Sequence, residues 1–83
     1  MSKIYKLPLV MEPQPEGGYV VTCPLLPELI TEGDSVEEAV HNANDALAAI
    51  IEAYEDLGKP LPPVLQSVHD DSPLWMDTVL AVP

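Results

Sequence analysis

Carboxylates are the most frequent side chains in this sequence that could take part in chemistry. Its 83 residues include 14 Asp or Glu, three Lys or Arg and two His, a formal net charge of -11. Pairs such as Glu37 and Glu38 fall on the polar side of a predicted helix, where charged residues usually only meet solvent. A metal-dependent nuclease would need carboxylates converging from several strands. Glu12, Glu32 and Asp77 are the set that could converge, and we keep this as the least favoured hypothesis.

Histidine, cysteine and serine offer no stronger route to catalysis. His41 and His69 have no second His or Cys at the spacing of metal ligands. Cys23 paired with a histidine is a conceivable nucleophile, yet a lone cysteine at a strand end more often packs as a small apolar group. Ser35 is explained by helix capping, and no glycine-rich phosphate loop is present. We therefore predict a protein that is not an enzyme, with no catalytic residue, metal site or cofactor.

The charge balance opposes a nucleic-acid partner and favours a basic protein. Proteins that track a phosphate backbone use Lys and Arg, of which this chain has three. We therefore expect no direct binding to nucleic acid. A strongly acidic surface attracts a basic partner and speeds the encounter, although solubility alone would also explain the charge.

The same residues predict a cytoplasmic protein that does not contact membranes. One cysteine cannot form an intramolecular disulfide, as expected in a reducing compartment. The first residues lack the apolar run of a signal peptide, and no stretch approaches the ~20 apolar residues of a membrane span.

Three short strands are predicted in the first 32 residues. Alternating apolar positions indicate a strand over residues 3–11, and the turn residues between 13 and 18 join it in a hairpin to a second strand at 19–23. A third short strand over 29–32 follows the interruption from Pro24 to Pro27. Pro8 falls inside the first strand, where proline removes a backbone donor, so we expect a bulge there or pairing of the last strand with only part of the first. The odd positions should face the core: Tyr5, Leu7, Leu9 and Met11.

A long amphipathic helix should begin after Ser35. Ser35 and Glu38 have the spacing of a capping box, in which Glu38 reaches back to the Ser35 amide. Gly58 is placed to end the helix, and the chain then continues as an extended proline-rich segment over 59–63. One apolar stripe follows the helix at spacings of three and four: Val36, Ala39, Val40, Ala43, Leu47, Ile50, Ile51, Tyr54 and Leu57.

The order of elements predicts an α+β fold, β-β-β-α-β, with a last strand over residues 74–82 and one domain over residues 1–83. A single helix covers only one face of the small, mostly antiparallel sheet. The opposite face would expose apolar residues, which usually marks an interface: Ile4, Val10, Val20, Trp75, Val79 and Ala81. Because a chain of this length also has a small core, we expect a homo-oligomer, a dimer or larger.

The ordered motifs of residues 3–63 resemble the HicB-like antitoxin family. These motifs are GYVV at 18–21, Pro24-x-x-Pro27, EGDS-x-EEA at 32–39, Ala43, Ala46 and GKPLPP at 58–63. The resemblance implies a truncated ribonuclease H-like β-β-β-α-β core and the antitoxin of a type II toxin-antitoxin pair. The implied partner is a HicA-like toxin, a small basic protein that cleaves mRNA with a histidine.

Three functions remain as hypotheses. The first is an antitoxin that occludes the basic toxin, with Glu28, Glu32, Asp34 and Trp75 as partner-binding candidates. The second is a solitary HicB-like oligomeric adaptor or ligand-binding module without a toxin, and the third is the nuclease named above. Many family members continue into a DNA-binding module, whereas this sequence stops at Pro83. We therefore expect no C-terminal DNA-binding module and no autorepression by this polypeptide alone.

Overall fold

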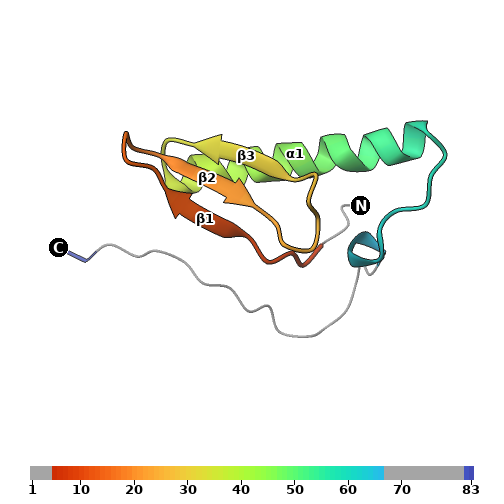
Figure 1. The fold of residues 1–83 in the computed structure, drawn as a ribbon, viewed down its shortest axis with the longest axis horizontal. Helices are drawn as coiled ribbons and strands as arrows, with labels where there is room; N and C mark the ends of the chain where they lie inside the picture. Colours follow the sequence, from red (N-terminus) through yellow and green to blue (C-terminus); the bar gives the residue numbers. More distant parts are fainter. Residues whose placement is uncertain (1–4, 67–81) are drawn as a thin grey trace.

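Three strands and one long helix make up most of the described part of the chain. The computed structural model describes residues 5–66 and 82–83. Strands β1 (Val10–Pro13), β2 (Tyr19–Thr22) and β3 (Ile30–Gly33) form an antiparallel sheet in that order. Helix α1 (Val36–Asp56) and the short 3-10 helix η1 (Pro63–Leu65) follow (Figure 1). The predicted α+β class and the order β-β-β-α are confirmed, while the strand predicted at residues 74–82 lies largely outside the described residues.

The first strand begins later than the sequence predicted. Its pairing with β2 runs from Val10 opposite Thr22 to Pro13 opposite Tyr19, so Pro8 precedes the ladder and makes no bulge in it. The alternative, partial pairing with the last strand, concerns residues that lie largely outside the described part of the chain. A proline cannot donate to a neighbouring strand, which favours starting the strand beyond it. The prediction for the core-facing side is nevertheless confirmed, because Tyr5, Leu7, Leu9 and Met11 all pack against the core.

Two glycines close the hairpin between β1 and β2. Gly17 and Gly18 have φ angles of 102° and 81°, a left-handed conformation that glycine adopts without strain. The Gln14 amide donates to the Gly18 carbonyl, and the Gly17 amide donates to the Gln14 carbonyl, each at 2.9 Å. The tight loop places the Gly18 backbone beside the end of β3, where an added Cβ would lie 2.9 Å from the Gly33 carbonyl oxygen.

Both ends of α1 are capped. The Glu38 amide donates to the Ser35 hydroxyl at 3.1 Å, as the capping box predicted. The Glu38 carboxylate, however, accepts from the amide of Asp34, at 3.1 Å, and not from that of Ser35. At the other end Gly58 has φ 66° and donates to Glu55, while the Lys59 amide donates to the Tyr54 carbonyl. These two backbone hydrogen bonds form a Schellman motif, which satisfies the last carbonyls of the helix.

The core lies between α1 and one face of the sheet, and extends under the loop after β2 to η1. Ala39 and Ala43 are the buried helix residues, and Leu47, Ile50 and Ile51 pack beside them. Val40 and Leu57 were predicted to join this stripe, but they are 46% and 68% exposed and lie outside it. Cys23 is only 3% exposed, as expected for a packed apolar group. The fully enclosed residues are Val21, Cys23, Leu26, Leu29, Ala39, Ala43 and Leu65.

The second face of the sheet carries two rows of outward side chains, which we call the open face. One row crosses the three strands as Val10, Thr22 and Ile30, and the other as Glu12, Val20 and Glu32. Val10 is 41% exposed and Ile30 is 65% exposed. Val10 and Val20 belong to the apolar face that the sequence predicted; the other four members, Ile4, Trp75, Val79 and Ala81, lie outside the described residues.

Candidate functional site

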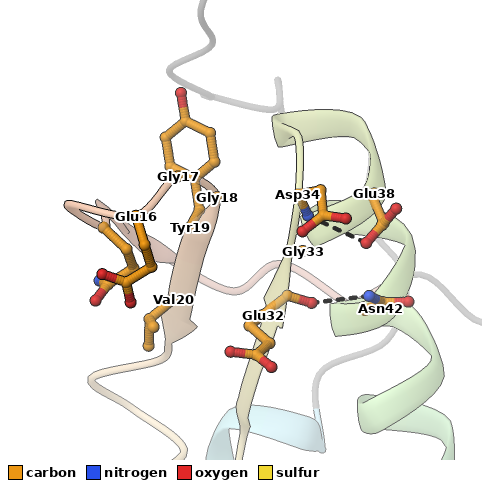
Figure 2. Close-up of a pocket in the computed structure, with 11 residues that line it drawn as sticks. Glu16, Gly17, Gly18, Tyr19, Val20, Glu32, Gly33, Asp34, Glu38 and Asn42 are labelled. Carbon is orange, nitrogen blue, oxygen red and sulfur yellow. Dashed lines mark hydrogen bonds between the residues drawn. The ribbon is translucent and has the colours of Figure 1, made fainter.

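An open pocket lies where the β1–β2 hairpin, the end of β3 and the start of α1 meet. Its volume is about 340 Å³. Figure 2 shows Glu16 and Tyr19 on the hairpin side, Glu38 and Asn42 on the helix side, and Glu32 between them. The lining residues are Gln14, Glu16, Gly17, Gly18, Tyr19, Val20, Glu32, Gly33, Asp34, Glu38 and Asn42.

Four carboxylates give this pocket a negative potential. Glu16, Glu32, Asp34 and Glu38 are all exposed, and no Lys, Arg or His is among the lining residues. Glu38 already accepts the Asp34 amide, so its carboxylate also holds the helix cap in place. Clustered charges of one sign beside the low-dielectric protein focus the local field. The pocket therefore attracts cationic groups such as Lys and Arg side chains.

Asn42 fixes the helix side of the pocket to the sheet. Its side-chain amide donates to the backbone carbonyl of Glu32 at 2.8 Å, and the residue is half-buried. Asn42 is not part of the apolar stripe predicted for the helix, so its spacing gave no reason to expect a contact with the sheet. The hydrogen bond fixes the position of the Glu32 backbone relative to α1.

The partner-binding candidates from the sequence do not all come together. Glu32 and Asp34 line the pocket, whereas Glu28 lies beside the C-terminal half of α1 and accepts a 2.6 Å hydrogen bond from the Tyr54 hydroxyl. Trp75 lies outside the described residues. Sequence reasoning missed Glu16, Glu38 and Asn42; the signal available for Glu16 was its position next to the two hairpin glycines.

The Glu28–Tyr54 hydrogen bond shifts the pKa values of the two groups in opposite directions. The Tyr54 hydroxyl stabilises the ionised carboxylate and so lowers the pKa of Glu28 below its ordinary value of 4.5. The same bond raises the pKa of Tyr54 above 10.0, because the phenol donates only while it is protonated. Glu28 thus joins the loop after β2 to α1, a structural contact within the chain.

Other chemistry finds no support among the residues that the structure describes. Within residues 5–66 and 82–83, no three His, Cys, Asp or Glu side chains are grouped so that they could hold a metal ion. Glu12 and Glu32 flank Val20 on the open face, and Asp77, the third member of the hypothetical nuclease set, lies outside the described residues. His41 makes an exposed 3.4 Å contact with Asp45 on α1. None of the described helices has the length and apolar content needed to span a membrane.

Comparison of the sequence with known proteins identifies the family to which this chain belongs. A family model described as the HicB-like antitoxin of bacterial toxin-antitoxin systems matches residues 6–78. Antitoxin HicB 1 of Photorhabdus laumondii is 45% identical over 74 residues, which cover 87% of this chain and 48% of that protein. Antitoxin HicB of Escherichia coli K12 is 40% identical over 67 residues, covering 78% of this chain and 48% of that protein.

A third relative differs in length. The UPF0150 protein ssr1765 of Synechocystis is 33% identical over 61 residues, which cover 74% of this chain and 77% of that protein. By contrast, this chain spans about half the length of the two HicB antitoxins. The family model matches most of the chain, including the hairpin, β3 and the whole of α1. The chain therefore belongs to the HicB-like antitoxin family.

Proposed function

We propose that this protein is an antitoxin that binds a small, basic, HicA-like mRNA-cleaving toxin and neutralises it by covering its active surface. Family membership supports an antitoxin role. The antitoxins of this family are not enzymes, in agreement with the sequence analysis. The observation that carries the proposal for this chain is the pocket whose described lining residues include four carboxylates and no Lys, Arg or His.

The proposed mechanism is competition for the same cations. A toxin that cleaves RNA must hold phosphates with Lys or Arg side chains. The pocket carboxylates of Glu16, Glu32 and Asp34 take the place of those phosphates, and the complex covers the catalytic histidine that the family's toxins are expected to use. Complementary charge mainly speeds association, whereas buried apolar contacts slow dissociation.

The location and the assembly are also proposals. Because mRNA is the toxin's substrate, we propose that the antitoxin acts in the cytoplasm. The small core supports a homo-oligomer, because association is a common way for a short chain to gain stability. Sedimentation equilibrium of the purified chain tests this directly, and a monomer at micromolar concentration would contradict it.

The experiment that tests the proposed function is growth rescue by co-expression. The proposal expects a small basic toxin to be encoded beside this gene, and induction of that toxin should arrest growth unless this chain is present. Replacing two pocket carboxylates, E32Q with D34N, should weaken toxin binding at least fivefold in isothermal titration, because two charges that attract the toxin are lost.

The matched control is E52Q with E55Q, which removes the same charge from exposed positions of α1. This control should rescue growth as well as the unmodified chain does. Failure of the unmodified chain to rescue, or the absence of a basic neighbouring gene product, would contradict the proposal and favour the solitary adaptor. Equal binding by the pocket variant and the control would remove the pocket from the mechanism.

A further inference from the structure

The open face of the sheet combines exposed aliphatic side chains with a pair of carboxylates in fixed register. Val10 and Ile30 lie on either side of Thr22 in one row, and both are substantially exposed. In the next row Glu12 and Glu32 lie on either side of Val20. Neighbouring strands are ~4.8 Å apart, so the two carboxylate-bearing positions stand about 10 Å from each other with an aliphatic residue between them.

We propose that the open face is the surface on which the basic toxin docks, an inference that rests on the proposed function. The aliphatic row would receive apolar side chains of the toxin, and the second row would receive two cationic side chains that lie on either side of one apolar contact. The pocket and the open face share Val20 and Glu32. A toxin seated on the open face therefore reaches the pocket carboxylates along one continuous surface.

Charge argues against a second copy of this chain as the occupant. Two open faces stacked on each other would bring Glu12 and Glu32 against the same carboxylates of the other copy, or against its aliphatic row. The first arrangement adds like-charge repulsion to a chain whose formal net charge is -11. The second buries ionised carboxylates against apolar groups without partners, which is also unfavourable. A basic surface with apolar side chains avoids both penalties.

The test compares two pairs of substitutions that make the same chemical change on different faces. V10T with I30T removes apolar area from the open face, where the two residues are 41% and 65% exposed. V40T with L57T makes the corresponding change on α1, where the two residues are 46% and 68% exposed. The probe is the small basic toxin that the proposed function expects beside this gene, with its expected catalytic histidine replaced, and its affinity is measured by isothermal titration.

The open-face pair should weaken toxin binding at least tenfold, because burial of aliphatic side chains at an interface would be lost. The α1 pair should bind within twofold of the unmodified chain. Urea unfolding of both pairs, expected at the same midpoint as the unmodified chain, excludes a folding defect. In addition, E12Q with E32Q should reduce the dependence of affinity on salt, whereas E37Q with E52Q should reduce it much less.

Each other outcome leads to a different conclusion about the open face. Equal toxin binding by the two apolar pairs would overturn the inference while leaving the antitoxin function in place. An open-face pair that binds toxin normally but changes a dimer into a monomer in sedimentation would assign the face to a second copy. A large drop in urea midpoint with unchanged affinity would mean that this chain covers the face itself. If the unmodified chain binds no toxin, the proposed function fails and this inference fails with it.

Discussion

At the scale of single residues, Gly33 sets the distance between the sheet and the helix. A Cβ added to Gly33 would lie 2.4 Å from the backbone nitrogen of Ala39, which is far closer than van der Waals contact. Ala39 is itself fully buried against the sheet. Because the colliding atoms belong to the helix backbone, no side-chain rotation relieves the clash. The absence of a side chain at this position thus permits the packing from which the core is built.

We predict that G33A destabilises the protein by about 3 kcal/mol, the upper end of the usual cost of overpacking. G58A is the control: its φ of 66° is unfavourable for alanine, but no atom lies within 4 Å of the added Cβ, so it should cost only about 1 kcal/mol. Urea unfolding followed by circular dichroism measures both. Equal stability of G33A and the unmodified chain would mean that α1 shifts away at little cost.

The Glu28–Tyr54 hydrogen bond makes stability depend on pH at both extremes. The folded-state pKa of Glu28 is lowered. Its contribution to the free energy of unfolding is therefore present above pH 4.5 and is lost as the pH falls through the folded-state pKa. The folded-state pKa of Tyr54 is raised. Its contribution to the free energy of unfolding is therefore present below pH 10.0 and is lost as the pH rises through the folded-state pKa.

We predict that Y54F returns the pKa of Glu28 upward toward 4.5, because phenylalanine cannot donate the hydrogen bond. NMR titration of the Glu28 side-chain carboxyl carbon measures this shift. The melting temperature of Y54F should also fall less than that of the unmodified chain on acidification below pH 4.5. A Glu28 pKa that Y54F leaves unchanged would assign its shift to other groups.

At the scale of elements, α1 is fixed by local signals at both ends. The Ser35 hydroxyl accepts the Glu38 amide at the start, and the backbone bonds around Gly58 satisfy the last carbonyls. Two acidic residues, Glu37 and Glu38, stand in the first turn, where the helix dipole favours negative charge. The start of the helix is also one wall of the pocket, so the cap positions residues that the proposed function uses.

We predict that S35A destabilises the protein by about 1 kcal/mol, because alanine leaves the Glu38 amide without its acceptor. S35D keeps an acceptor and adds negative charge at the helix start, so its stability should stay close to that of the unmodified chain. Thermal unfolding of both variants measures the difference. If S35A were as stable as S35D, the capping bond would contribute nothing to the fold.

The elements show where sequence reasoning succeeds and where it stops. Helix α1 was predictable because its cap, its terminal glycine and its apolar period are all local signals. The start of β1 was not, because alternation continues back through residues 5–9 while the pairing with β2 begins only at Val10. The pocket was predictable only in part: Glu32 and Asp34 are near each other in sequence, but the Asn42 contact depends on how α1 packs against β3.

At the scale of the whole molecule, the dominant property is the excess of negative charge. A formal net charge of -11 on 83 residues creates an attractive field for any basic protein. Such a field acts before contact, so it alters the rate of association more than the lifetime of the complex.

We predict that the association rate with the toxin falls roughly tenfold or more between 0.05 and 0.5 M NaCl, because salt screens the field. The dissociation rate should change much less, since buried apolar contacts are not screened. Stopped-flow fluorescence with the histidine-substituted toxin separates the two rates. An association rate independent of salt would show that charge does not guide the encounter.

The contact between Asn42 and the Glu32 carbonyl has one more effect on the molecule. β3 is an edge strand of the described sheet, and edge strands offer vacant backbone groups to which foreign strands can add in amyloid-like aggregation. The Asn42 amide already occupies one of these carbonyls, at 2.8 Å. That acceptor is therefore unavailable to a foreign strand adding at this edge, where Ile30 is 65% exposed.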